Sequence, residues 1–153
     1  MKNRTTVERK SERELVVTRT FDAPARIVFE AWAKPELFRQ WWVPKSLGMW
    51  LVSCEADVRA GGRYRLVFGG GMEFFGKYLE VVPHSRLVWT NEESGEAGSV
   101  TTVTFEEQDG RTLLVVHELY PSKEALDAAG GAADAMGEQF EQLDELLAGL
   151  RDE

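Results

Sequence analysis

The chain has 153 residues, with 26 acidic and 18 basic side chains and a formal net charge of −8. A length near ~150 residues is typical of one domain, and 43% hydrophobic residues fit a folded chain better than a disordered one. The acidic balance argues against nucleic acid or an anionic membrane as a partner, since both require a basic face.

The single cysteine, Cys54, cannot form an internal disulfide, so nothing requires an oxidising compartment. Zinc needs three or four protein ligands, and Cys54, His84 and His117 stand singly with no ligand-like spacing. Met1 to Glu14 lacks the apolar region of a secretory signal, and no apolar stretch approaches the ~18 residues of a membrane span. We therefore expect a cytoplasmic protein without a membrane segment, a metal or a cofactor.

The first predicted elements are a strand and two short helices. Leu15–Phe21 is rich in β-branched residues and predicts a strand. Pro24 suits the first turn of a helix, and apolar residues at helical spacing follow it as far as Trp32. Pro35 begins a second, short helix. Residues 1–12 are predicted to be a flexible segment that precedes a single domain of residues 13–151.

From Leu51 to Tyr120, short apolar runs alternate with turns rich in Gly, Pro and Asp, which predicts an antiparallel meander. Asp109-Gly110 is the strongest of these hairpin signals. The predicted strands are Val52–Val58, Arg63–Phe68, Met72–Val82, Leu87–Asn91, Val100–Gln108 and Thr112–Tyr120.

The last segment predicts a long helix that begins after a break at Gly130-Gly131, with Ser122 as the N-cap of the turn before it. Its spacing could also indicate a coiled coil, but a seven-stranded sheet needs a helical cover, which favours packing within the chain. The apolar stripe, spaced alternately by three and four residues, consists of Leu126, Ala129, Ala133, Met136, Phe140, Leu143, Leu147 and Leu150.

The Gly69–Gly71 turn sets the register of one hairpin. A three-residue loop places Leu66 opposite Phe74, and Tyr64 opposite Gly76, so that these side chains share the inner face. Gly76 leaves room beside the Tyr64 ring, where a larger residue would fill the space.

The Asp109-Gly110 hairpin places Phe105 opposite Leu114, and Thr101 opposite Glu118. In this register Glu118 faces the interior and His117 faces outward. A slip of one residue would reverse the two, so either can be the polar group inside, and we favour Glu118.

Several local motifs, in this order, resemble the START-like helix-grip superfamily (also called SRPBCC), in its branch of activator of heat-shock-protein-90 ATPase homologues. They extend over about Leu15 to Leu150. A departure is Gly137-Glu138, where many relatives have Gly-Trp. The motifs are Phe21-Asp22-Ala23-Pro24, Pro35-Glu36-Leu37, Trp41-Trp42-Val43-Pro44, Gly61-Gly62-Arg63-Tyr64, Gly76-Lys77-Tyr78-Leu79-Glu80-Val81, Arg86-Leu87-Val88-Trp89 and Val103-Thr104-Phe105.

This resemblance implies an α+β helix-grip fold, in which a seven-stranded curved antiparallel sheet wraps a long C-terminal helix. It also implies a hydrophobic cavity between the sheet and that helix. Relatives include binders of lipids and small molecules, polyketide cyclases and a chaperone-binding domain, so the fold does not select one activity. The residues expected to line the cavity are Trp41, Tyr64, Leu66, Phe74, Tyr78, Trp89, Phe105, Glu118, Met136 and Phe140.

Three functions compete at this point. Non-enzymatic binding of a small hydrophobic molecule ranks first, because it needs only a cavity and a few polar groups. A cofactor-free cyclase, hydrolase or isomerase would need an acid or base in the cavity, for which Glu118, Tyr64, Tyr78 and Tyr120 are the candidates. A chaperone-interacting module or a homodimer is supported only by the acidic segment Ser122–Glu153, which carries nine acids and two bases.

Overall fold

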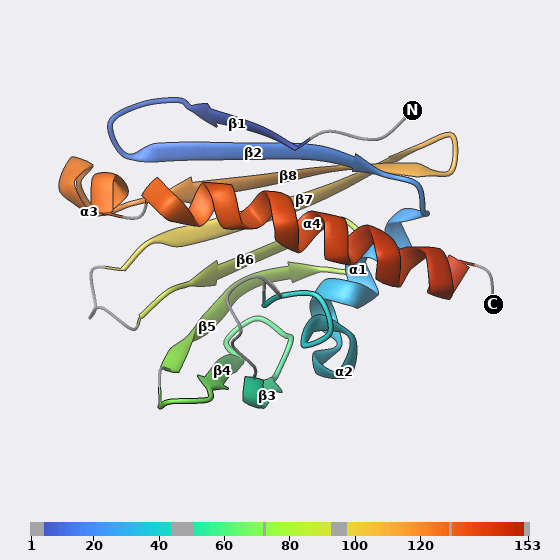
Figure 1. The fold of residues 1–153 in the computed structure, drawn as a ribbon, viewed down its shortest axis with the longest axis horizontal. Helices are drawn as coiled ribbons and strands as arrows, with labels where there is room; N and C mark the ends of the chain where they lie inside the picture. The colour runs from blue at the N-terminus through green and yellow to red at the C-terminus, as the bar shows by residue number, and fades with distance from the viewer. Residues whose placement is uncertain (1–4, 44–50, 72, 93–97, 129, 152–153) are drawn as a thin grey trace.

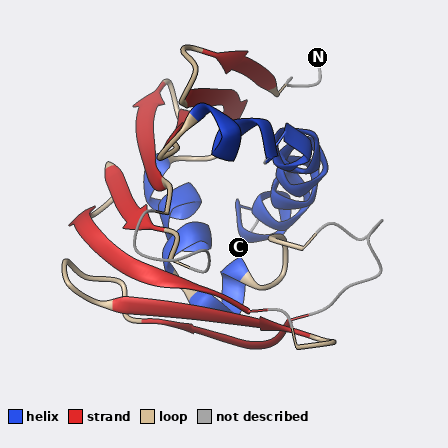
Figure 2. Cartoon of the chain, turned by 90° about the vertical axis from the view of Figure 1, so that its left-hand side faces the viewer, coloured by secondary structure: helices blue, strands red, loops and turns tan. Residues whose placement is uncertain are grey.

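The computed structural model describes residues 5–43, 51–71, 73–92, 98–128 and 130–151. Eight antiparallel strands form one sheet in the order β1-β2-β8-β7-β6-β5-β4-β3. The sheet curves, and the helices lie on its concave side (Figures 1 and 2). This arrangement is the helix-grip architecture that the sequence predicts.

The bounds of the strands confirm the seven predicted ones, with ends that differ by at most two residues. Met72, the expected first residue of one strand, lies outside the described residues. The strands are β1 (Thr6–Arg9), β2 (Glu14–Phe21), β3 (Leu51–Ala56), β4 (Arg63–Phe68), β5 (Glu73–Val82), β6 (Arg86–Thr90), β7 (Val100–Gln108) and β8 (Arg111–Leu119).

The sheet has one strand more than the seven predicted. The additional strand is β1, which lies within the segment predicted to be flexible. It pairs with the free edge of β2, with Val7 opposite Val17 and Thr6 opposite Thr18. All four β1 residues are exposed, so they carry none of the inside-outside alternation that reveals a strand in a sequence. Strand β1 has no buried face, and it forms because its backbone pairs with the open edge of β2.

Both predicted hairpin registers are confirmed. Leu66 pairs with Phe74 and Tyr64 with Gly76. An added Cβ at Gly76 would lie 1.9 Å from the Thr90 carbonyl oxygen and 2.9 Å from the Tyr64 ring, so a larger residue would clash there.

The β7–β8 pairing places Thr101 opposite Glu118, and Thr102 opposite His117. Glu118 therefore shares the inner face, and the His117 ring lies on the outer face, where its Nε2 is 2.9 Å from Glu14 Oε2. The alternative of an inward His117 is excluded.

The helices are α1 (Ala25–Ala33), α2 (Pro35–Phe38), α3 (Lys123–Ala128) and α4 (Gly130–Arg151). Pro24 precedes α1, and the Ser122 Oγ accepts the amide proton of Ala125 at 3.1 Å, which caps α3 as predicted. The boundary between α3 and α4 falls beside the glycine pair that predicted a break.

The main core lies between the concave face of the sheet and α4. From the predicted stripe, Met136, Phe140, Leu143 and Leu147 are buried against β2, α1, β7 and β8 residues such as Phe21. The Phe140 ring meets the Phe21 ring edge-on at 5.5 Å. Ala133, which also belongs to the predicted stripe, has a side chain that lies outside the described residues.

Side-chain polar contacts fix α4 to the rest of the molecule, among them a hydrogen bond from Gln139 to the Trp42 carbonyl oxygen. Arg19 on β2 is 2% exposed and forms an ion pair with Asp144 on α4. The Gln142 side-chain amide donates to the carbonyl oxygens of Trp41 and Val43, each at 2.9 Å. Helix α4 is thereby joined both to the sheet and to the segment after α2.

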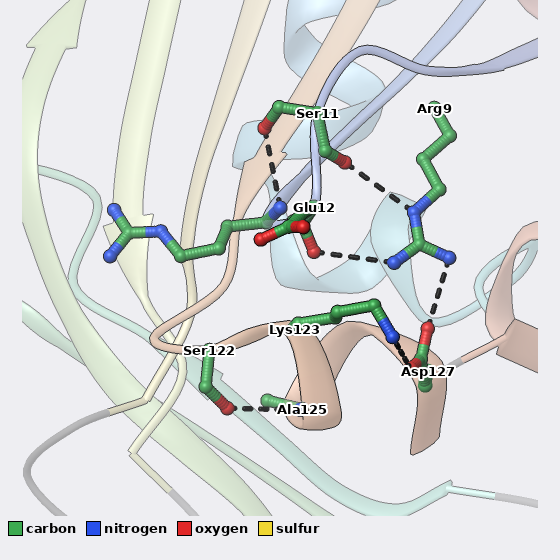
Figure 3. Close-up of polar contacts among 8 residues, drawn as sticks. Arg9, Ser11, Glu12, Ser122, Lys123, Ala125 and Asp127 are labelled. Atoms are coloured by element: carbon green, nitrogen blue, oxygen red, sulfur yellow. Dashed lines mark hydrogen bonds and ion pairs between the residues drawn. The ribbon is translucent and has the colours of Figure 1, made fainter.

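Helix α3 is held by the β1–β2 hairpin (Figure 3). The Arg9 guanidinium bonds to Asp127 at 2.9 Å and also donates to the Ser11 and Glu12 carbonyl oxygens. Lys123 lies 3.3 Å from the same Asp127 carboxylate, and the two cations hold the pKa of Asp127 below its usual range. Strand β1, although exposed, therefore contributes to placing α3.

Candidate functional site

A cavity of about 640 Å³ lies on the concave side of the sheet. Its volume falls within the ~300–1,000 Å³ of sites that bind small molecules. Aromatic and aliphatic side chains make most of its surface. The lining residues are Trp32, Ala33, Pro35, Phe38, Trp42, Cys54, Ala56, Tyr64, Leu66, Phe74, Tyr78, Trp89, Asn91, Gly98, Ser99, Glu118, Tyr120, Pro121 and Ala125.

The cavity lies between two hydrophobic clusters. The larger one is the main core, and the smaller is centred on Leu51, Leu66 and Phe68 on strands β3 and β4. Phe38 and Trp42 contact both clusters and also line the cavity. One sheet thus serves two packing centres, and the space between them stays open.

The structure places six of the ten candidate residues on the cavity wall. They come from four different strands, which the hairpin register and the sheet order bring together. These residues are Tyr64, Leu66, Phe74, Tyr78, Trp89 and Glu118.

The other four candidates, Trp41, Phe105, Met136 and Phe140, lie in the packed core instead. Trp41 is fully buried, and its indole N–H donates to the Ala31 carbonyl oxygen at 2.9 Å. The Phe105 ring packs against Phe29 at 5.4 Å. The four side chains fill the space between the sheet and the helices, and none is among the lining residues.

The wall opposite the sheet also differs from the prediction. It comes from α1, α2 and α3, through residues such as Trp32, Phe38 and Ala125. No α4 residue with a described side chain lines the cavity. Because the apolar stripe of α4 is in direct contact with the core, the open space lies to one side of this helix.

The polar groups of the cavity gather on one side. The Tyr120 hydroxyl donates to Glu118 Oε2 at 2.6 Å, and the Thr101 hydroxyl also donates to the Glu118 carboxylate. Asn91 Nδ2 in turn donates to Thr101 Oγ1 at 3.0 Å, and the Tyr64 hydroxyl donates to the Thr90 carbonyl oxygen at 2.8 Å. We call Asn91, Thr101, Glu118 and Tyr120 the polar cluster.

Burial shifts the pKa values of titratable groups on this wall. Desolvation raises the pKa of Glu118, and the hydrogen bonds from Tyr120 and Thr101 only partly oppose it. Desolvation also raises the pKa of Tyr78, and it raises that of Tyr120 with a further contribution from the Glu118 charge. Both tyrosines therefore stay neutral at physiological pH.

Two further groups on the wall bear on its chemistry. Trp32 is 4% exposed, and its indole N–H has no hydrogen-bond partner in the described part of the chain. The Cys54 thiol is half-buried, 3.8 Å from the Pro35 carbonyl oxygen, and desolvation raises its pKa. In the described part no three His, Cys, Asp or Glu side chains gather as they would to hold a metal ion.

Sequence reasoning missed several lining residues. Phe38 and Trp42 carried a signal, since they are large aromatic residues within and just after the short second helix, and their rings stack at 4.7 Å. Asn91 and Ser99 lie beside a turn predicted from the sequence, and no periodicity shows which side of the sheet such residues face. Ala125 lines the cavity because of the position of α3, and that position depends on tertiary contacts that the sequence does not show.

Taken together, the curved sheet, the helices on its concave face and the largely apolar cavity define a protein of the START-like helix-grip class. Residues 22–148 match the family described as Activator of Hsp90 ATPase homolog 1-like protein, and the chain belongs to this family. A search of curated protein sequences finds no match.

Three solved structures illustrate the likeness. A protein of Rhodobacter sphaeroides has a TM-score of 0.86 at 24% identity, covering 95% of this chain and 99% of its own. A protein of Nitrosomonas europaea has a TM-score of 0.81 at 24% identity, covering 95% and 100%. A protein of Staphylococcus epidermidis is 28% identical, with a TM-score of 0.75 and 94% of both chains covered. Their names state no activity, so the likeness shows the fold.

The helices also bear on the membrane question. Over the described residues, none combines the length and the apolar character that crossing a bilayer requires.

Proposed function

We propose that this protein binds a small, largely hydrophobic molecule in the cavity between the sheet and helices α1, α2 and α3. The observation that carries the proposal is the cavity itself, whose volume suits a small molecule and whose wall is mainly apolar. Membership of a helix-grip family supports it, because that architecture commonly holds ligands on the concave face of the sheet. The polar cluster supplies the few hydrogen-bonding groups that orient a ligand in such a site.

The test is to fill the cavity and measure ligand binding. Ala56 is half-buried on β3 and lines the cavity, so the ring of Ala56→Phe enters space that a ligand needs. We expect the wild-type protein to bind naphthylethanol, with a change in the fluorescence of the lining residues Trp32, Trp42 and Trp89. Ala56→Phe should weaken this binding at least about tenfold, the equivalent of ~1.4 kcal/mol.

The matched control is Ala148→Phe, which adds the same ring at an exposed position of α4. This variant should bind naphthylethanol as the wild type does. Equal binding by Ala56→Phe and the wild type, with both variants folded by circular dichroism, would show that the ligand lies elsewhere. Native mass spectrometry of the purified wild-type protein adds an unbiased search for a bound molecule.

A further inference from the structure

The carboxyl group of Glu118 poses a chemical question that binding of a hydrophobic molecule does not answer. It is partly buried on the wall of a mainly apolar cavity. A carboxylate in such a place is costly unless it is hydrogen-bonded and paired with a cation. The groups around Glu118 therefore indicate which ligand would complete the site.

Hydrogen-bond donors surround the Glu118 carboxylate. Tyr120 and Thr101 both donate hydroxyl protons to it. The Thr101 oxygen in turn accepts a proton from Asn91 Nδ2 at 3.0 Å. This chain of donors suits an ionised carboxylate that accepts hydrogen bonds.

No described residue forms an ion pair with this carboxylate. On its own strand, His117 lies on the outer face and bonds to Glu14. The neighbouring strands present Leu15 on β2 and Thr101 on β7. Helix α3 presents Ala125, while its charged residues are exposed on the surface.

Desolvation raises the pKa of three other lining groups, Cys54, Tyr78 and Tyr120, so these stay neutral at physiological pH. No Asp, Lys or Arg is among the described lining residues. Glu118 is therefore the one formally charged group on the described wall, and it has no charged partner there.

The aromatic wall suits a positive charge. Trp32, Trp42, Trp89 and Tyr78 line the cavity with Glu118. The faces of such rings attract cations, most strongly where water is excluded. An ammonium group would meet a carboxylate acceptor and an electron-rich surface in the same cavity, and its hydrocarbon part would bury the apolar wall.

We propose that the cavity selects hydrophobic amines in their protonated form, with the ammonium group hydrogen-bonded to the Glu118 carboxylate. This inference rests on the proposed function and adds the charge and chemical class of the ligand. It assigns Glu118 the role of a specificity determinant, and the polar cluster that of holding its carboxylate in place.

Three probes of similar shape test the charge preference: naphthylethylamine, naphthylethanol and naphthylacetate, a cation, a neutral molecule and an anion. Isothermal titration calorimetry of the wild-type protein at neutral pH should show the amine binding at least about tenfold tighter than the alcohol, as for a charge-assisted hydrogen bond. The acetate should bind most weakly. Equal affinities for amine and alcohol, or tightest binding of the acetate, would overturn the inference.

The Glu118→Gln variant keeps the size of the side chain and removes its charge. We expect the affinity for the amine to fall about tenfold relative to that for the alcohol, so that the preference for the amine is lost. Glu14→Gln removes an equal charge on the outer face of the sheet, and it should keep the preference for the amine. An amine preference that survives in Glu118→Gln, or that Glu14→Gln removes equally, would contradict the assignment.

A measurement on the wild-type protein covers the case in which the variant does not fold. The affinity for the amine should fall as the pH drops through the pKa of Glu118, whereas that for the alcohol should stay constant. A pH-independent affinity for the amine would overturn the inference. Failure of all three probes to bind would remove the proposed function as well, while binding of the alcohol without an amine preference would remove only this inference.

Discussion

At the scale of single residues, Glu118 shows what the hairpin rule can predict. The two-residue Asp109-Gly110 turn sets the partner of every residue on β7 and β8, so the sequence is enough to place Glu118 inside and His117 outside. The hydrogen bond from Asn91 to Thr101 was beyond prediction. Asn91 follows β6, and no two-residue turn in the sequence fixes the register of β6 against β7.

The raised pKa of Glu118 has a consequence for stability. Folding raises this pKa above its ordinary value of 4.5, so the folded state holds the proton more tightly than the unfolded chain does. The free energy of unfolding therefore falls as the pH rises through this window. The ionised group destabilises the empty protein above its folded pKa.

We expect Glu118→Gln to be more stable than the wild type at neutral pH, because the amide carries no charge and its oxygen can accept the Tyr120 hydroxyl proton. The advantage should shrink as the pH falls below 4.5, where the carboxyl is neutral in both states. Urea unfolding of both proteins across this pH range measures it. An advantage that grows toward low pH would contradict the assigned direction. A variant that is more stable but binds the amine less tightly would show that the wild-type protein gives up stability for ligand binding.

At the scale of elements, local signals predict the strands and helices of the meander because each is bounded by Gly, Pro or Asp. Strand β1 escapes prediction, since all of its residues are exposed and it forms through backbone pairing alone. The cavity wall is a similar case. The apolar stripe of α4 predicts that this helix packs against the sheet. The position of the cavity depends instead on how α1, α2 and α3 pack, which no local pattern shows.

Helix α4 influences the cavity indirectly, through its hydrogen bonds to the segment after α2. Gln142 is 8% exposed and donates to the Trp41 and Val43 carbonyl oxygens, on either side of the lining residue Trp42. Gln142→Leu would leave both carbonyls without this donor. The expected loss is about 1–3 kcal/mol of unfolding free energy, measured by urea denaturation, together with weaker binding of naphthylethanol.

The control for this prediction is Glu145→Gln, at an exposed position of the same helix, which should change the stability by less than about 0.5 kcal/mol. If Gln142→Leu matched this control in both measurements, the side chain would not be what places Trp42.

At the scale of the whole molecule, the order of motifs and the two hairpin registers are enough to predict the helix-grip architecture. The exact count of strands and the position of the cavity are not, because both depend on contacts between segments far apart in the chain. The Arg19–Asp144 pair is such a contact, as it joins β2 to α4. Nothing in the alternation of β2 distinguishes Arg19 from an inward hydrophobic residue except its charge.

Asp144→Asn would leave the guanidinium of Arg19 buried without its carboxylate. We expect a loss of about 2 kcal/mol, below the ~3–5 kcal/mol for a fully buried pair, because Asp144 keeps a third of its side-chain surface exposed. Thermal and urea unfolding measure the change. Glu73→Gln breaks the exposed Arg65–Glu73 pair and should alter stability little. Equal effects of the two substitutions would mean that Arg19 finds another partner.

Cys54 is the one thiol of the chain, and it lies on the cavity wall. Because desolvation raises its pKa, the thiol stays protonated at neutral pH and reacts slowly with reagents from solution. Compounds carrying a disulfide would accumulate there when the rest of the compound is retained long enough for exchange. The protein thus contains a built-in attachment point for tethered fragment discovery, and every captured fragment would report which chemical groups its interior accepts.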